Sequence, residues 1–106
     1  GPRALGDDVL RAGRVVLDRA RREVSVDGAP VHLTFSEFEV LYALLRARGR
    51  LLSRQELLDA IFGGHEFRDP RAIDVHVHFL RDKLTAAGAD PDLIVTVRGA
   101  GYRLRA

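Results

Sequence analysis

The chain has 106 residues, 46% of them hydrophobic, which is enough for one compact domain with a modest core and too short for two domains. Cysteine is absent, which excludes disulfides and thiolate chemistry, and no apolar run approaches the ~20 residues that a transmembrane helix needs. No stretch resembles a signal peptide, so we expect a cytoplasmic protein with no attachment to a membrane.

The net charge is only +2, but the basic residues are unevenly placed. Lys83 is the only lysine, and an arginine excess of this kind is explained at least as well by a GC-rich genome as by function. The positions of the arginines are more informative than their number. Residues 94–106 contain Arg98, Arg103 and Arg105 and no acidic residue, which makes this segment locally basic.

Residues 1–8 are small or charged and follow no pattern, so we expect a linker remnant or a cloning scar there and a domain over residues 9–106. Between residues 9 and 34, alternating apolar residues predict short antiparallel strands with one buried face. The alternating pairs are Val15 and Leu17, Val24 and Val26, and Val31 and Leu33. Asp27-Gly28 predicts a tight turn between the last two pairs.

The alternation then gives way to a helical period. Residues 34–37 (Thr-Phe-Ser-Glu) and 53–56 (Ser-Arg-Gln-Glu) have the pattern of capping boxes, which begin helices. Glycines at 49 and at 63–64 predict where the two helices end. The apolar faces comprise Phe38, Leu41, Tyr42, Leu44 and Leu45 in the first helix and Leu57, Leu58, Ile61 and Phe62 in the second. Two capped helices separated by a few residues are typical of a helix-turn-helix unit.

A third helix is predicted over residues 70–86, with Asp69 as its N-cap and Pro70 in its first turn. Its buried stripe is predicted to contain Ile73, Val77, Leu80 and Leu84. The opposite face carries Arg71, Val75, His78, Phe79 and Asp82.

The chain ends in two β-rich runs, residues 94–97 and 102–104, around the turn Arg98-Gly99-Ala100-Gly101. The order is thus a small antiparallel sheet, three helices and a hairpin with a basic tip. This order predicts an α+β winged helix-turn-helix fold. In such folds the third helix enters the major groove of DNA and the hairpin, or wing, reaches the neighbouring minor groove.

Three motifs then resemble the effector domain of OmpR/PhoB-type response regulators. Residues 22–38 are similar to its opening, residues 71–84 to its recognition helix, and residues 97–103 (Val-Arg-Gly-Ala-Gly-Tyr-Arg) to its wing. The resemblance covers about residues 9–105. It implies a sequence-specific regulator of transcription, with no cofactor and no enzymatic activity.

The resemblance also implies roles for residues. Arg71, His76 and Arg81 match positions that touch phosphates or base edges, and Arg98 matches a wing arginine at the minor groove. Two further wing positions are expected to bond to phosphates: Thr96 and Tyr102. With the exposed helix residues, the expected DNA contacts are Arg71, Val75, His76, His78, Phe79, Arg81, Thr96, Arg98 and Tyr102. The expected RNA polymerase contacts are Gly63, Gly64, His65, Glu66, Phe67, Arg68 and Asp69.

The expected partners follow from the same family. They are double-stranded DNA with direct repeats, RNA polymerase, an N-terminal receiver domain absent from this chain, and a cognate histidine kinase. The isolated domain is expected to be a monomer that binds DNA as a head-to-tail tandem dimer.

The sequence departs from the family at three positions of the third helix, where basic or small polar residues are usual. His78 could read a base, Phe79 could pack on a thymine methyl group, and Asp82 would repel phosphate. We therefore expect fewer electrostatic contacts from this helix and more dependence on the wing and on DNA shape.

Several alternatives remain on the residues alone. Arg71 and Arg81 could pair with Asp74 or Asp82, Phe79 could pack on the wing or on another subunit, and Tyr102 could be mainly a core residue. If residues 74–79 formed a strand, Asp74, His76 and His78 could bind zinc in a hydrolase. The chain could also be a winged helix that binds proteins and has lost DNA binding.

Overall fold

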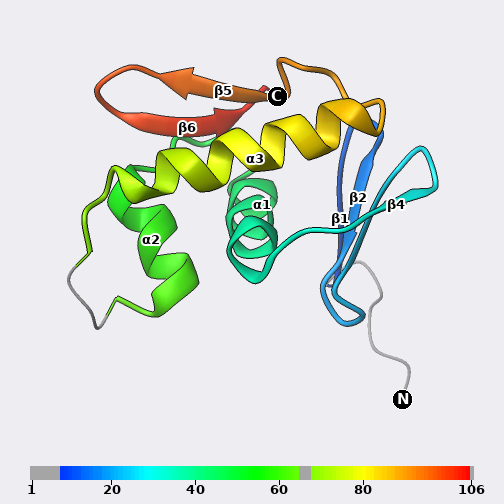
Figure 1. The fold of residues 1–106 in the computed structure, drawn as a ribbon, viewed down its shortest axis with the longest axis horizontal. Coiled ribbons are helices and arrows are strands. Elements are labelled where there is room, and N and C mark those ends of the chain that lie inside the picture. The colour runs from blue at the N-terminus through cyan, green and yellow to red at the C-terminus, as the bar shows by residue number, and fades with distance from the viewer. Residues whose placement is uncertain (1–7, 65–67, 106) are drawn as a thin grey trace.

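The computed structural model describes residues 8–64 and 68–105. A four-stranded sheet comes first, three helices follow, and a two-stranded hairpin closes the chain (Figure 1). The predicted α+β winged-helix fold is confirmed in its class and in the order of its elements.

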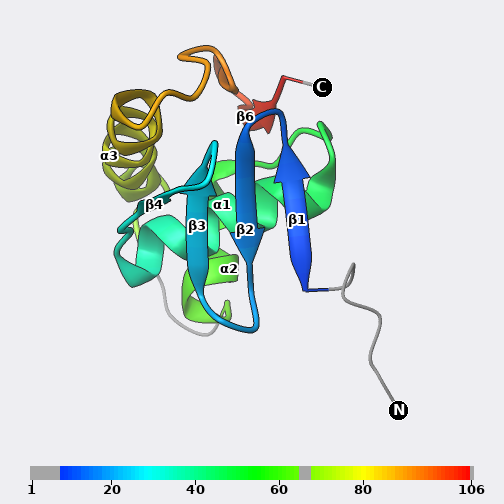
Figure 2. The same cartoon turned by 90° about the vertical axis from the view of Figure 1, so that its right-hand side faces the viewer.

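The N-terminal sheet is antiparallel, with strands in sequence order from β1 (Val9–Ala12) and β2 (Val15–Asp18) to β3 (Glu23–Val26) and β4 (Ala29–Val31) (Figure 2). One face is buried, as the alternation predicted, by Val15, Leu17, Val24 and Val26. The tight turn between β3 and β4 is Asp27-Gly28, whose positive φ angles of 51° and 83° suit this residue pair. The pattern did not single out β1, because its residues are only partly buried.

Helices α1 (Phe35–Ala47) and α2 (Arg54–Phe62) both begin at the predicted capping boxes. The Thr34 hydroxyl accepts a hydrogen bond from the Glu37 amide at 3.2 Å, and Glu37 Oε1 accepts from the Thr34 amide at 2.9 Å. Ser53 and Glu56 make the same pair of bonds at the start of α2. Each box satisfies amides that the first turn of a helix would otherwise leave unpaired.

Helix α3 (Ala72–Ala86) buries the predicted stripe, but the prediction of its start was wrong. Asp69 is not its N-cap. The Asp69 carboxylate accepts from the Arg71 amide at 2.9 Å, and its carbonyl accepts from the Ala72 amide at 2.9 Å. These bonds close a tight turn ahead of the helix. The N-cap is Arg71, which makes no side-chain capping bond.

The wing consists of β5 (Ile94–Val97) and β6 (Gly101–Leu104), which pair antiparallel as predicted. Close to its turn, the wing is fixed to the segment between α1 and α2, because Leu52 and Tyr102 exchange two backbone hydrogen bonds of 2.9 Å. Gly101 lies at this contact. A Cβ atom on Gly101 would stand 2.0 Å from the Leu52 carbonyl oxygen, so only glycine fits there.

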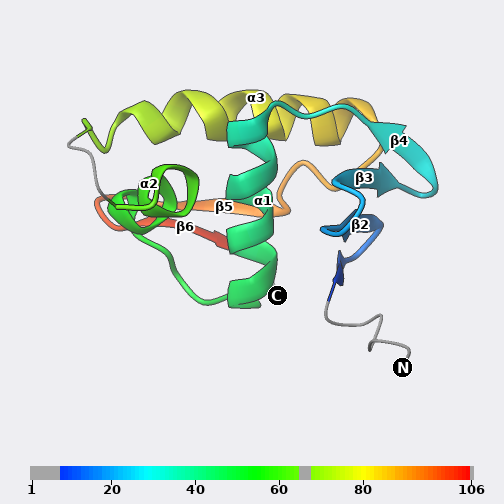
Figure 3. The same ribbon diagram turned by 90° about the horizontal axis from the view of Figure 1, so that it is seen from below.

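Helix α1 occupies the middle of the molecule, with the N-terminal sheet on one side and α2 and the wing on the other (Figures 1 and 3). The core is therefore shared by all the layers, and the most fully buried side chains come from the sheet and all three helices: Leu17 and Val26, Leu41 and Leu44, Leu57, and Ile73 and Leu80. No described helix has the length and apolar composition to cross a bilayer.

Candidate nucleic-acid interface

The outward face of α3 is exposed along its length. Val75 and Phe79 leave 55% and 49% of their surface open to solvent, which is unusual for large apolar side chains. Arg71, His78 and Asp82 are also exposed, and His76 is half-buried at the flank. The helical period puts these residues opposite the buried stripe, as the sequence predicted.

The N-terminal end of α3 carries an exposed ion pair. Arg71 Nη2 lies 2.9 Å from Asp69 Oδ2, so its partner is neither of the aspartates considered from the sequence. Hydrogen bonds from Arg71 lower the pKa of Asp69. Because the Arg71 side chain is 83% exposed, this pair can exchange for a phosphate at little cost.

The middle of the face holds a small cluster. His78 Nε2 lies 3.4 Å from Asp82 Oδ2, one helical turn away, and the His78 and Phe79 rings pack in a T-shaped arrangement at a centroid distance of 5.3 Å. The zinc alternative required a strand over residues 74–79, but these residues are helical. Among the described residues no three His, Cys, Asp or Glu side chains gather where they could hold a metal ion.

Arg81 is directed at the wing. Its Nη2 donates to the carbonyl of Ile94 at 2.8 Å and to the hydroxyl of Thr96 at 2.6 Å, and its Nε donates to the same carbonyl at 3.2 Å. The pairing with Asp74 or Asp82 that the sequence allowed is not formed. Two predicted DNA contacts, Arg81 and Thr96, are thus joined to each other.

Tyr102 is a core residue, only 4% exposed. Its hydroxyl donates a hydrogen bond to Oδ1 of Asp74, which also accepts from Arg54 Nε at 2.8 Å. Burial opposes ionisation of Asp74, but the bonds from Tyr102 and Arg54 outweigh it and lower the Asp74 pKa. Burial and the Asp74 carboxylate raise the pKa of Tyr102, so its hydroxyl remains protonated.

The wing tip is open. Arg98 is exposed, at the start of a turn closed by a 3.0 Å bond from the Ala100 amide to the Val97 carbonyl. Within residues 8–64 and 68–105 its guanidinium has no hydrogen-bond or ion-pair partner. The tip lies at the same end of the molecule as the N-terminal end of α3, in both Figure 1 and Figure 3. A basic group and the exposed helix face are thus presented together.

The loop expected to contact RNA polymerase is described only in part. Gly63 caps α2 in the left-handed conformation, with φ of 78°, and the guanidinium of Arg68 lies 3.7 Å from the ring centroid of Phe62. His65, Glu66 and Phe67 lie outside the described residues, as do residues 1–7 of the expected linker.

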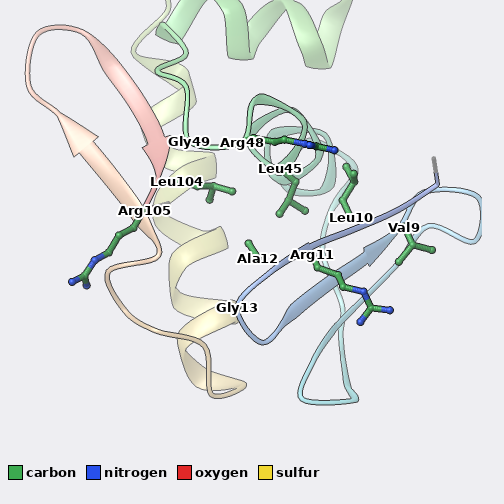
Figure 4. Close-up of a pocket in the computed structure, with 10 residues that line it drawn as sticks. All are labelled: Val9, Leu10, Arg11, Ala12, Gly13, Leu45, Arg48, Gly49, Leu104 and Arg105. Carbon is green, nitrogen blue, oxygen red and sulfur yellow. The ribbon is translucent and has the colours of Figure 1, made fainter. Parts of the chain in front are cut away.

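A hollow of about 450 Å³ lies away from these residues, between β1, the end of α1 and the end of β6 (Figure 4). Its wall includes Leu10, Leu45 and Leu104, while Arg11 and Arg105 point away from its middle. None of the predicted contact residues lines it, so it is separate from the α3 and wing surface.

Comparison with known proteins identifies the family. A family model described as the C-terminal part of transcriptional regulatory proteins matches residues 28–104. The chain belongs to this family. The match takes in all three helices and the wing, and with the relatives below it confirms the resemblance to OmpR/PhoB-type effector domains.

Two relatives illustrate the similarity. The chain is 45% identical over 98 residues to the sensory transduction protein RegX3 of Mycolicibacterium smegmatis, and it covers 43% of that protein. It is 43% identical over 96 residues to the phosphate regulon transcriptional regulatory protein PhoB of Rhizobium meliloti, and it covers 42% of that protein. These alignments span 92% and 91% of this chain. The chain thus spans less than half the length of either relative.

Solved structures share the fold. The DNA-binding domain of CpxR from E. coli superposes with a TM-score of 0.78 at 34% identity, over 91% of this chain and 94% of that one. The response regulator AdeR DNA-binding domain, in complex with an intercistronic region, has a TM-score of 0.80 at 26% identity, over 89% and 96%. The Klebsiella pneumoniae RstA DNA-binding domain, in complex with the RstA box, has a TM-score of 0.76 at 31% identity, over 91% and 95%.

Sequence reasoning missed the roles of Arg54 and Asp74. Arg54 was visible only as the second residue of a capping box, and Asp74 only as a possible partner of Arg71 or Arg81 or as a possible zinc ligand. Their bond joins residues 20 positions apart, and the bond to Tyr102 spans 28 positions. The available signal was the position of Asp74 beside the buried stripe of the third helix, since a partly buried carboxylate needs a hydrogen-bond partner.

Proposed function

We propose that this chain is the output domain of a two-component response regulator, binds double-stranded DNA sequence-specifically and regulates transcription. The N-terminal end of α3, whose outward face is exposed, lies at the same end of the molecule as the wing tip, where Arg98 is exposed, and this observation carries the proposal. A helix face fits the major groove, and an arginine on a hairpin turn fits the adjacent minor groove.

In this proposal α3 reads bases mainly through apolar and weakly charged groups. Val75 and Phe79 are placed to meet thymine methyl groups, and His78 to donate to a base edge. Arg71 exchanges Asp69 for a phosphate, and His76 bonds to the backbone at the flank. Asp82 lowers the affinity for the phosphate backbone. Specificity therefore depends on shape and apolar fit more than is usual for such a helix.

The wing supplies the charge that α3 lacks. Arg98 inserts into or beside the minor groove, where a narrow groove concentrates negative potential. Thr96 and Tyr102 face each other in the wing, and Arg81 contacts the wing from α3. The polar side-chain atoms of all three already have partners within the chain. Their direct phosphate contacts stay predictions that the experiments below separate from a second role.

The rest of the proposal concerns the longer protein. Because the chain spans less than half of RegX3 and PhoB, we propose an N-terminal receiver domain controlled by a histidine kinase, with residues 9–106 as the effector domain. Two copies would bind direct repeats head to tail, while a single domain stays monomeric. Residues 63–69 would contact RNA polymerase.

Selection from a random duplex pool by the 106-residue chain, at near-physiological salt, tests the proposal. Enrichment of a short motif, repeated in one orientation about one helical turn (~10 bp) apart, is the expected result. Affinity for that motif should fall steeply as salt rises, since phosphate contacts release counterions.

The alternative function is a winged helix that binds a protein through the exposed Val75 and Phe79. Under that alternative no motif is enriched, even when two copies are fused to mimic the dimer. A motif that emerges only from the fused dimer supports DNA binding and shows that the single domain lacks affinity.

A further inference from the structure

The side chains that hold the wing against α3 form a connected set. Asp74 and Arg81 both belong to α3, seven positions apart, which places them about 10 Å apart along the helix. Asp74 accepts from Tyr102 of β6, and Arg81 donates to Ile94 and Thr96 of β5. Each wing strand therefore has its own tie to the same helix.

Two separate contacts fix the angle between the wing and α3, whereas a single contact would let the wing rotate about it. Without them the wing would be held by its backbone pairing with Leu52 and by the packing of its buried residues. The tip at Arg98 has no partner among the residues that the structure describes. Its position relative to α3 is therefore decided by the contacts that the two wing strands make with α3 and with Leu52.

Tyr102 is enclosed as well as bonded. The guanidinium carbons of Arg54 and Arg81 each lie 5.6 Å from the centroid of its ring. Arg54, from α2, also bonds to Asp74 and so keeps the carboxylate directed at the tyrosine. Side chains of two helices, α2 and α3, thus converge on one aromatic side chain of the wing.

We propose that Tyr102 and Arg81 are positioning residues that set the wing at the angle at which Arg98 and α3 engage DNA together. This inference rests on the proposed function. Tyr102 acts through the Asp74 carboxylate, and Arg81 acts through Thr96 and the Ile94 carbonyl. Neither residue needs to touch DNA to affect the affinity, because the effect is exerted through Arg98.

A double-mutant cycle separates positioning from direct contact. The dissociation constant for a duplex carrying the selected motif is measured for the parent chain, Tyr102→Phe, Arg98→Ala and the double variant. Tyr102→Phe keeps the ring and removes only the hydroxyl. We expect it to weaken binding about fivefold in the parent and less than about twofold in the Arg98→Ala background, because contacts that act as one unit are not additive.

A second cycle guards against a folding defect. Thr96→Val removes one of the two acceptors of Arg81 at an exposed strand position, where the change of shape is small. Like Tyr102→Phe, Thr96→Val should weaken DNA binding in the parent chain and have a smaller effect in the Arg98→Ala background. Tyr42→Phe is the matched control, because it also removes a hydrogen-bonded tyrosine hydroxyl, but one that lies away from the wing. The Tyr42 hydroxyl accepts from Arg46 of α1 and from Arg19 in the turn after β2. Tyr42→Phe should leave the affinity unchanged in both backgrounds.

The outcomes are distinct. Equal effects of Tyr102→Phe and Thr96→Val in both backgrounds would overturn the inference and assign the two hydroxyls direct or purely structural roles. In that case Arg98→Ala still weakens binding, and the proposed function stands. If the parent chain selects no duplex, even as a fused dimer, the proposed function fails and this inference fails with it.

Discussion

The ammonium nitrogen of Lys83 lies 2.6 Å from Oε1 of Glu37, although the two residues are 46 positions apart. The same carboxylate oxygen accepts from the Thr34 amide at the start of α1. The Glu37 side chain is only 5% exposed. One buried carboxylate therefore caps α1 and fixes the C-terminal half of α3 to it.

Acid should weaken this tie. Burial opposes ionisation of Glu37, but the bonds from Lys83 and Thr34 outweigh it and lower the Glu37 pKa. A carboxyl group with a folded-state pKa below its unfolded value stabilises the fold fully above the unfolded value and loses that contribution as pH falls through the folded value. We expect the free energy of unfolding, measured by urea titration, to fall as the pH drops from 5 to 3, roughly the carboxyl titration range.

Glu37→Gln tests the assignment. It should lower the free energy of unfolding at pH 7 by about 2 kcal/mol, since a charged hydrogen bond is lost and Lys83 is left half-exposed without its partner. As the pH falls, the free energy of unfolding of this variant should decrease less than that of the parent chain. The control is Glu23→Gln, at a side chain that is 66% exposed. Parallel pH profiles for the parent and Glu37→Gln would contradict the role given to Glu37.

Gly101→Ala should destabilise the chain severely. The new Cβ would overlap the Leu52 backbone, and φ is 149°, which side chains rarely adopt. We expect a loss of about 3 kcal/mol or more in the free energy of unfolding. Gly99→Ala provides the comparison, because its φ of 75° is strained but its surroundings are open. That change should cost about 1 kcal/mol. Similar losses for both would mean that the close approach to Leu52 is unimportant.

Arg98→Ala should weaken duplex binding by about 1–3 kcal/mol, roughly fivefold to 150-fold, without changing the melting temperature. The slope of log affinity against log salt should become less steep by about one unit, because one phosphate-neutralising group is gone. Arg21→Ala removes an equal charge at a site 75% exposed, in the turn after β2. If it weakens binding as much as Arg98→Ala does, the wing has no special part in recognition.

Asp82→Asn should strengthen binding. The carboxylate lies on the exposed face of α3 and pairs with His78, so it repels phosphate and occupies a group that could contact a base. Its removal should raise the affinity about threefold to tenfold at low salt and less at high salt, where charges are screened. The matched control is Asp27→Asn in the β3–β4 turn, where asparagine tolerates the φ of 51°. An unchanged affinity for Asp82→Asn would place this residue away from the DNA.

Local patterns in the sequence accounted for most of the fold. The capping boxes, the stripe of α3 and the Asp27-Gly28 turn each depend on residues a few positions apart, so periodicity and residue type suffice. The predicted start of α3 was wrong because an aspartate can either cap a helix or close a turn. The residues around Asp69 determine which of these hydrogen bonds forms.

The candidate site was less predictable where the wing packs against α3. The exposed residues of α3 follow from its period, and Arg98 follows from the hairpin. The bonds of Tyr102 to Asp74 and of Arg81 to Thr96 depend on how the wing packs against α3, which spacing along the chain does not reveal. The sequence analysis had predicted Tyr102, Arg81 and Thr96 as separate DNA contacts and Asp74 as a possible partner of an arginine.

The contrast between two nearby glycines of the wing bears on how such a domain can acquire a new operator. Gly101, where β6 leaves the turn, has no room for any side chain, so substitutions are not tolerated there. At the tip, the space around Gly99 is open and Arg98 is exposed. Divergence of binding specificity should therefore accumulate at residues 98–100 and on the outward face of α3. A library confined to those positions would explore new operators while leaving the folding of the domain intact.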